Sequence, residues 1–283
     1  MGILCFSLKA DDLAWCAYMA GAREGAAVEI RLDQCGFNEE DVQKLFHLPK
    51  RAKTIATCHV DLPSQLDNAV RLLSAAILAG ADYVDIPLDF PDTTRRWLMN
   101  LALNHGCQVI LSYHNYNATD PLERLLQLAR QAQYEGADII KIVTKAHSKE
   151  DADTVLSLYD HFPAERLVAF AMGPLGQSSR FLSFQKGAPL LFVAPNRDAV
   201  PAEVAAKEFE IYKAQAAASG KPENIQEKIA TGRLEKYYAE NCLTEQAFVK
   251  DGDLTIQAYT DKVAKELGGS IKVMDFVRFA LGE

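Results

Sequence analysis

The feature that most constrains the fold is an alternation of short apolar stretches with longer amphipathic ones along most of the chain. The short stretches are rich in β-branched residues and predict buried strands. They lie at 3–8, 27–32, 53–58, 83–88, 108–113, 138–143, 167–172 and 189–194. The longer stretches between them place apolar residues at helical spacing. This alternation predicts an α/β fold with a parallel sheet, most simply closed as a (β/α)8 TIM barrel.

An open, doubly wound sheet is the alternative architecture. Such a sheet usually carries a glycine-rich nucleotide loop after its first strand. The segment SLKADD at 7–12 contains no glycine, and the barrel is therefore the favoured prediction. The motif GAD at 80–82 and 136–138 supports the same rhythm, because its glycine is expected to end a helix just before the next strand.

The rhythm stops near Ser219, where the sequence becomes polar, helical and rich in paired charges. We predict that 1–218 form the barrel, with 202–218 as its last helix. The remaining residues, 219–283, are expected to form a small α+β appendage. Its final segment, 270–283, is predicted to be a strand or a hairpin.

Composition narrows the class of function. The net charge is −8 at pH 7, which argues against nucleic acid as the main partner. No apolar stretch is long enough for a membrane span, and the first residues do not resemble a secretion signal. The six cysteines form no C-x-x-C pair, which is typical of a reduced, cytoplasmic protein. The histidine spacing indicates no metal site.

The predicted strand at 27–32 and the residue after it carry two rows of side chains, because neighbours along a strand point to opposite faces. The apolar row is Val28, Ile30 and Leu32, and the charged row is Glu29, Arg31 and Asp33. The apolar row must pack on the helices, so the charged row is expected to point into the barrel and form a polar pocket. The alternative is a Glu29–Arg31 pair that only supports the barrel.

A lysine interrupts another predicted strand, 138–143, where Lys141 lies among isoleucine and valine. A buried ammonium group is costly, so Lys141 is expected to be either paired, or neutral and used in chemistry. The strand before it ends close to His114, at the edge where barrels place their active sites. Because the two strands are consecutive, these side chains are expected to be neighbours.

Together, these two residues predict imine chemistry. An apolar pocket and nearby cations would lower the pKa of Lys141, and the neutral amine would condense with a ketone or an aldehyde. His114, with a pKa near the ordinary value of an imidazole, would take a proton from carbon and return it to a leaving group. The alternative for Lys141 is a side chain that reaches the rim and pairs with Glu29.

Arg180 lies in the segment MGPLGQSSR, 172–180, after the seventh predicted strand. A guanidinium group there is expected to hold an anionic substrate through two parallel hydrogen bonds. The glycines of the segment would let the backbone approach a ligand closely. A surface arginine that opens a helix is the equally weighted alternative.

Four segments resemble type I 3-dehydroquinate dehydratase in order and spacing: VEIRLD, VILSYHNY, GADIIKIV and AMGPLGQSSR. The resemblance runs from the first residue to about Ala194. It implies a TIM barrel, usually a homodimer, that acts in the shikimate pathway. It also implies dehydration of 3-dehydroquinate to 3-dehydroshikimate with no metal and no organic cofactor.

The resemblance also implies a role for each matching residue. Lys141 would form a Schiff base with the substrate ketone, and His114 would be the general acid and base. The implied substrate-binding residues are Glu29, Arg31, Arg180, His59 and Ser7, with Arg180 on the substrate carboxylate.

The sequence departs from the family pattern in three places. His59 stands after the third strand, where the family usually has an arginine that contacts the substrate, so weaker substrate binding is expected. Pro87 stands where a glutamate is common. In the family's closing loop, Ala199 and Glu203 replace a serine and a glutamine, and the new carboxylate would repel the carboxylate of the substrate.

The last stretch, about 198–283, resembles the C-terminal part of elongation factor Ts. It implies a piece of the nucleotide-exchange factor for elongation factor Tu. The N-terminal module and the Thr-Asp-Phe contact loop of that factor are not found, so we expect no exchange activity and at most a weak contact with elongation factor Tu.

Two alternatives to the dehydratase remain open. One is another imine-forming barrel lyase, such as a class I aldolase, which a substrate panel with a sugar phosphate would separate from it. The other is non-enzymatic: the tail docks on elongation factor Tu and the barrel is a passenger.

Overall fold

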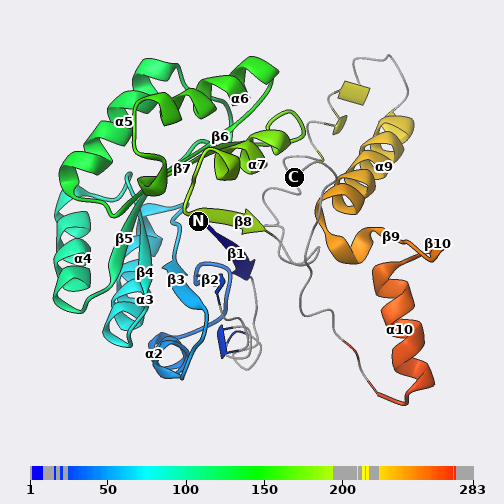
Figure 1. The fold of residues 1–283 in the computed structure, drawn as a ribbon, viewed down its shortest axis with the longest axis horizontal. Helices are drawn as coiled ribbons and strands as arrows, with labels where there is room; N and C mark the ends of the chain where they lie inside the picture. The colour runs from blue at the N-terminus through cyan, green and yellow to red at the C-terminus, as the bar shows by residue number, and fades with distance from the viewer. Residues whose placement is uncertain are drawn as a thin grey trace. The chain divides into compact units, whose positions relative to one another are not determined.

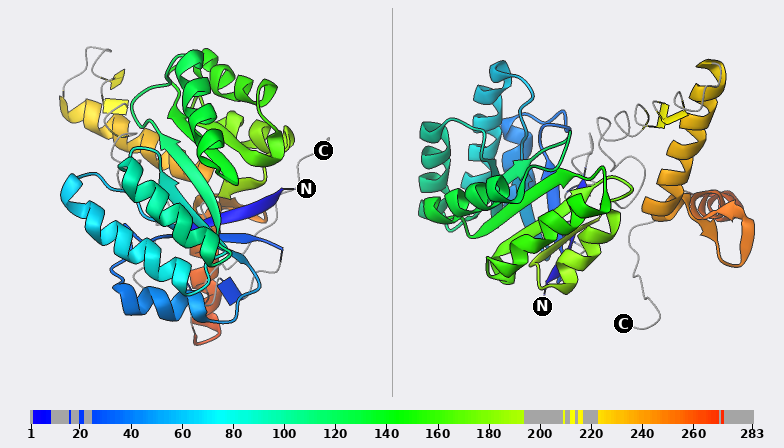
Figure 2. Two further views of the ribbon diagram at one scale, coloured as in Figure 1. Left: turned by 90° about the vertical axis from the view of Figure 1, so that its left-hand side faces the viewer. Right: turned by 90° about the horizontal axis from the view of Figure 1, so that it is seen from above.

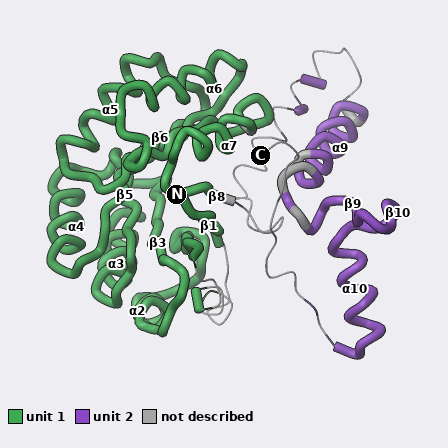
Figure 3. Tube along the Cα trace, in the orientation of Figure 1, with its two compact units in different colours: residues 1–193 green, residues 194–283 purple. Residues whose placement is uncertain are grey.

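The computed structural model describes residues 2–8, 16, 20–21, 25–193, 209, 212–213, 215–216, 223–269 and 271. They belong to two compact units, Met1–Val193 and Ala194–Glu283, which Figure 3 shows in green and purple.

The first unit is built on eight strands that lie side by side in one sheet (Figure 1). They are β1 (Ile3–Leu8), β2 (Ala27–Arg31), β3 (Lys53–Thr57), β4 (Tyr83–Pro87), β5 (Gln108–His114), β6 (Ile139–Lys145), β7 (Leu167–Met172) and β8 (Leu190–Val193). Their order is β7-β6-β5-β4-β3-β2-β1-β8, and every neighbouring pair is parallel. The sheet is a near-closed barrel, and the carboxyl ends of all its strands meet at one rim.

Helices follow the strands and cover the outer face of the sheet, as Figures 1 and 2 show. They are α2 (Glu39–His47), α3 (Leu66–Leu78), α4 (Asp92–Asn104), α5 (Leu122–Glu135), α6 (Lys149–Leu156) and α7 (Gln177–Gln185). Short 3-10 turns lie at η1 (Pro63–Gln65), η2 (Ser157–Asp160) and η3 (Ala164–Arg166). The predicted fold class is confirmed, and every predicted strand is present with ends shifted by no more than about two residues.

Local sequence explains where the helices begin and end. Asn38 caps α2 and Ser148 caps α6, each through a side chain that accepts a hydrogen bond from the backbone three residues later; such caps satisfy amide groups that the first turn leaves unpaired. Gly136 ends α5 at φ 98°, and Gly80 follows α3 at φ 89°. These left-handed positions favour glycine, which confirms the prediction from the GAD motif.

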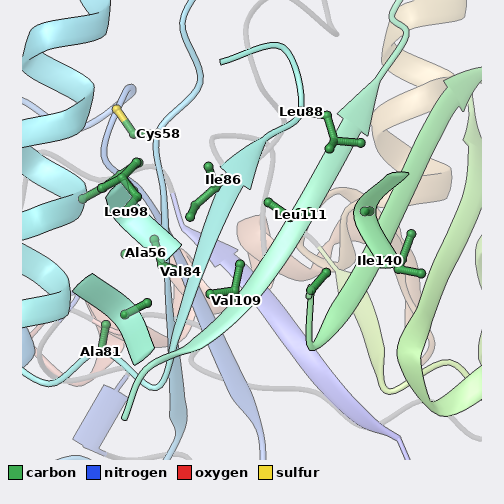
Figure 4. Close-up of a cluster of buried hydrophobic side chains, with 14 of the residues drawn as sticks. Ala56, Cys58, Ala81, Val84, Ile86, Leu88, Leu98, Val109, Leu111 and Ile140 are labelled. Atoms are coloured by element: carbon green, nitrogen blue, oxygen red, sulfur yellow. The ribbon is translucent and has the colours of Figure 1, made fainter. Parts of the chain in front are cut away.

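Alternation along the strands creates two apolar layers. The outer layer lies between strands and helices, and Figure 4 shows part of it, with Ile86 and Leu111 on strands and Leu98 on a helix. The inner layer fills the barrel and includes Phe170 and Phe192. As predicted, Val28, Ile30 and Leu32 lie in the outer layer, so the charged row of β2 points inward.

The second unit contains α9 (Glu223–Asn241), η5 (Leu243–Glu245), β9 (Ala247–Phe248), β10 (Asp251–Thr255) and α10 (Ile256–Glu266). The two strands form an antiparallel hairpin, and the ring of Phe248 stacks on that of Tyr259 at 4.1 Å. Thr255 caps α10. Before α9, Lys213 lies in a helical stretch, and its Nζ lies 2.9 Å from Oε1 of Glu227.

Several predictions concern residues outside the described part of the chain. These are most of the expected last barrel helix, 202–218, the closing-loop residues Ala199 and Glu203, and nearly all of the final segment 270–283. The predicted domain limits, 1–218 and 219–283, stay predictions. Among the described residues, no helix is both long and apolar enough to cross a membrane.

Candidate active site

Lys141 is the centre of a polar layer inside the barrel. It lies in β6 opposite Ser112 of β5 and Val168 of β7, and only 4% of it is exposed. Its Nζ donates a hydrogen bond to Oδ2 of Asp85 in β4 at 2.8 Å and lies 3.3 Å from Oε1 of Glu29 in β2. The pair with Glu29 therefore spans the interior between strands that are not neighbours.

The two carboxylates decide the protonation of Lys141. Burial lowers the pKa of this lysine, but the attraction of Asp85 and Glu29 outweighs burial and raises the pKa above its usual value. The Nζ also lies 4.2 Å from the centre of the Phe192 ring, a contact that favours the cation. The expectation of a lowered pKa and a neutral amine in the free protein is therefore wrong: the amine is buried as a paired ammonium group.

Glu29 is held by three groups. Ser7 and Thr57 donate hydrogen bonds to its two oxygens, Thr57 at 3.0 Å, and Lys141 contacts Oε1. Burial raises the pKa of Glu29, but the charges of Lys141 and Arg31 and these hydrogen bonds bring the pKa down to about 2. Glu29 is thus a fixed negative charge at neutral pH. Ser7, which was predicted to bind substrate, contacts this carboxylate.

Arg31 forms a two-pronged ion pair with Asp33. Its Nη2 lies 2.7 Å from Oδ2 and its Nε 3.1 Å from Oδ1 of Asp33. Burial lowers the pKa of Arg31, but Asp33 and Glu29 outweigh it and raise the pKa. Arg31 and Glu29 both lie inside the barrel, as predicted. They have different partners, because Arg31 pairs with Asp33 and Glu29 pairs with Lys141.

His114, His59 and Tyr116 form a cluster of rings at the carboxyl ends of β5 and β3. The rings of His59 and His114 are 4.6 Å apart and tilted by 53°, and Tyr116 stacks on His114 at 5.7 Å. Nδ1 of His59 shares a hydrogen bond of 3.1 Å with the Tyr116 hydroxyl.

The surroundings of both imidazoles lower their pKa and favour the neutral form. Burial is the main cause that lowers the pKa of His114, and His59 and Lys141 lower it further. Burial, Arg31 and Lys141 likewise lower the pKa of His59. The expectation that the pKa of His114 lies near the ordinary imidazole value is wrong, because burial, and after it the neighbouring positive charges, lower that pKa. A neutral His114 is nevertheless ready to accept a proton.

Arg180 lies in the first turn of α7, at the carboxyl end of β7. Its guanidinium carbon lies 4.8 Å from the centre of the Phe170 ring, and its Nη1 is 3.5 Å from the carbonyl oxygen of Phe192. Both phenylalanines belong to the inner layer of the barrel. The residue lies in the first turn of a helix, as one reading of the sequence expected, and the other reading, that it holds an anionic substrate, stays a prediction.

Two interior residues were missed by reasoning from sequence. Asp85 is fully buried. It lies between the apolar residues Val84 and Ile86, and the same alternation in β2 had predicted that Glu29 points into the barrel. Lys145 lies on the same face of β6 as Lys141 and is 5% exposed. It ends the strand beside Gly173, whose φ is 84°; a Cβ at this glycine would lie 3.1 Å from Nζ of Lys145.

Among the described residues, no three histidine, cysteine, aspartate or glutamate side chains are grouped as they would be around a metal ion. The barrel interior instead holds an amine paired with two carboxylates, and two imidazoles lie at the carboxyl ends of β3 and β5. A parallel barrel with a buried amine of this kind, next to a neutral imidazole, has the groups of a Schiff-base enzyme.

The comparison with protein families narrows this class. The family model for type I 3-dehydroquinase matches residues 5–216, and the chain belongs to that family. Residues 192–283 match the model for elongation factor Ts, so an elongation factor Ts-like segment follows the dehydroquinase domain.

Solved structures agree with the fold. A type I 3-dehydroquinate dehydratase from Clostridium difficile matches with a TM-score of 0.62 and 20% identity, covering 69% of this chain and 85% of that one. The 3-dehydroquinate dehydratase from Enterococcus faecalis matches with a TM-score of 0.60 and 23% identity, covering 68% and 88%. For the tail, elongation factor Ts from Clostridium kluyveri is 52% identical over 88 residues, which are 31% of this chain and 29% of that protein.

Proposed function

We propose that the chain is a hydro-lyase that dehydrates 3-dehydroquinate to 3-dehydroshikimate through a Schiff base on Lys141. The observation that carries the proposal is the position of Lys141, buried in the barrel between Asp85 and Glu29, in a chain of the type I 3-dehydroquinase family. His114 lies two residue pairs further along the same two strands, opposite Val143.

The amine must first lose a proton. The hydrogen bond of 2.8 Å from Lys141 to Asp85 offers a direct path for that proton, and Oδ1 of Asp85 is buried without a partner among the described residues. The neutral amine then attacks the ketone carbon, and Asp85 returns its proton to the hydroxyl group of the adduct, which leaves as water and gives an iminium ion. Glu29 stays ionised and stabilises the positive charge of that ion.

The iminium ion makes the neighbouring C–H bond acidic. Neutral His114 takes that proton and becomes an imidazolium ion, while the electron pair forms an enamine. The enamine then expels the β-hydroxyl group, which leaves as water with the proton returned by His114. Hydrolysis of the remaining iminium ion releases the product and restores the amine of Lys141, so the cycle needs no oxidant or reductant. Arg180 holds the substrate carboxylate at the mouth.

Borohydride trapping tests the proposal directly. Mixing the chain with 3-dehydroquinate and sodium borohydride should reduce the iminium ion to a stable secondary amine and leave one substrate-derived adduct on the peptide that contains Lys141. Lys145 is the internal control, because it is a second buried lysine on the same face of the same strand. An adduct on Lys145, or no adduct from a folded chain, would refute the assignment. The variant Lys141→Met should show no adduct and no turnover.

A second candidate function is contact with elongation factor Tu. The tail is 52% identical to part of elongation factor Ts over 88 residues, but the chain spans only 29% of that protein's length. Binding of the full chain to immobilised elongation factor Tu tests this function, and Phe248→Ala, which removes the ring stacked on Tyr259, should weaken any contact. Assembly as a homodimer is likewise proposed from the family, and sedimentation of the full chain tests it.

A further inference from the structure

The histidine pair at the carboxyl ends of β3 and β5 has features that the steps above leave unused. His59 contacts His114 through its ring and Tyr116 through Nδ1. Its Nε2 is buried and has no hydrogen-bond partner among the described residues. A buried nitrogen of this kind costs free energy, so its position in the cluster calls for a reason other than stability.

We propose that His59, held by Tyr116, is a positioning residue for His114, so that the two imidazoles take up one proton between them and act as a single-proton base. The inference rests on the proposed function, in which His114 carries the proton. It concerns the free protein as well, because the three rings are in contact without substrate.

The geometry argues for the coupling. Two imidazolium rings with centres 4.6 Å apart would repel each other strongly in a buried site, so the second proton is suppressed once the first is bound. Tyr116 contacts both histidines, since its ring stacks on His114 and its hydroxyl group forms the hydrogen bond with His59. That hydrogen bond orients the ring of His59 toward His114.

The charged groups around the pair favour the same outcome. Arg31 and Lys141 act on both rings and disfavour a positive charge, whereas Asp85 favours one on His114. After His114 takes a proton from the substrate, His59 stays neutral and the proton is confined to one site. The resulting imidazolium ion is a strong acid, which returns its proton readily to the leaving hydroxyl group.

Titration of the histidines by NMR tests this inference without any turnover. The chain has six histidines, so their ring nitrogens can be followed one by one in the free protein. In His59→Asn, the pH midpoint of His114 should rise by roughly 1 unit, because His59 no longer takes the shared proton, whose charge suppresses protonation of His114. His105→Asn, which changes an exposed histidine in the turn before β5, should leave that midpoint unchanged.

Tyr116→Phe is the second variant, and it removes only the hydroxyl group that forms the hydrogen bond with His59. The ring nitrogen shifts of His59 should then change, because Nδ1 loses its hydrogen bond, and the midpoint of His114 should move as well. If either folded variant leaves the titration of His114 as it is in the parent chain, the inference is overturned. Because no substrate is present, this result is independent of whether the chain dehydrates 3-dehydroquinate.

A kinetic readout separates positioning from mere packing. His114 must be neutral to take the proton, so a higher midpoint moves the acid limb of kcat/KM to higher pH. His59→Asn should therefore lose activity at a higher pH than the parent chain, by the same shift as the NMR midpoint. A lower kcat with an unmoved acid limb would show that His59 only fills space.

Discussion

The Nζ atom of Lys141 lies 2.8 Å from Oδ2 of Asp85, and neither side chain is more than 6% exposed. Asp85 is thus the closest carboxylate to the proposed nucleophile. The variant Asp85→Asn keeps the shape but removes the charge, and Lys141 is left with Glu29 alone. We expect the free energy of unfolding to fall by about 3 kcal/mol, because a buried ammonium group loses one of its two anions.

The same variant should lower the pKa of Lys141, since Asp85 is the largest cause that raises it. Urea unfolding measures the stability, and the pH dependence of borohydride trapping measures the pKa of the Lys141 amine. Asp92→Asn is the control, because the side chain of Asp92 is 69% exposed and its partner Arg95 keeps a second carboxylate, that of Glu135. It should change stability by no more than about 0.5 kcal/mol. Equal effects of the two variants would contradict the buried pair.

Glu29 predicts a specific dependence of stability on pH. Its pKa is lowered from 4.5 to about 2 on folding, so the unfolded chain binds this proton first. The stabilisation is fully present above the unfolded value of 4.5 and is lost as the pH falls through about 2. Between pH 6 and pH 3, the stability advantage of the parent chain over Glu29→Gln should shrink by about 2 kcal/mol.

Urea unfolding of both chains at the two pH values measures this difference. The comparison cancels the protonation of other carboxylates, since these are shared by the two chains. A constant difference between pH 6 and pH 3 would show that Glu29 titrates alike in the folded and the unfolded state.

Most of the fold could be predicted because strands and helices leave different periods in the sequence. The eight strands followed from β-branched stretches, and the inward direction of Glu29 and Lys141 followed from alternation. The same alternation in β4 points Asp85 inward, so this residue was within reach of sequence reasoning. Its importance was not, because alternation says which face a side chain occupies and not how far it lies from a lysine two strands away.

The charge state of Lys141 illustrates what sequence leaves open. Apolar neighbours along β6 argue for a neutral amine, but the atoms that decide its pKa belong to β2 and β4. The sign of the pKa shift depends on distances of 2.8 Å and 3.3 Å, and only the closed barrel sets these distances. The histidine cluster is similar, because His59 and His114 are far apart in the chain and meet only through strand order.

Arg95 ties the loop after β4 to α5 and predicts a large cost of truncation. Its guanidinium group is 4% exposed and contacts Oε1 of Glu135 at 2.8 Å and the carbonyl oxygens of Leu88 and Phe90. Arg95→Ala should lower the free energy of unfolding by about 3 kcal/mol, because it leaves several buried acceptors without their hydrogen-bond donor. The exposed neighbour Arg96 is the matched control, and Arg96→Ala should cost less than about 0.5 kcal/mol by urea unfolding.

Gly173 should tolerate no side chain. Its φ of 84° is left-handed, and an added Cβ would lie 3.1 Å from Nζ of Lys145. Gly173→Ala is expected to cost about 1–2 kcal/mol in stability. In the background Lys145→Ala the crowding is relieved and the backbone strain remains, so Gly173→Ala should still destabilise that background, but by less. An unchanged cost in both backgrounds would show that Lys145 plays no part.

Arg180 supplies the last prediction, which separates substrate binding from chemistry. Its guanidinium group faces the barrel interior over Phe170, at the mouth where the carboxylate of the substrate is proposed to bind. Arg180→Ala removes a charge-assisted contact, which corresponds to roughly a 10- to 100-fold loss in kcat/KM. If the contact is equally strong in the ground and transition states, the loss should appear in KM with kcat little changed. Steady-state kinetics measure both constants, and Arg124→Ala, which changes an exposed arginine of α5, should leave them unchanged. A fall in kcat with KM constant would instead assign Arg180 to the transition state alone.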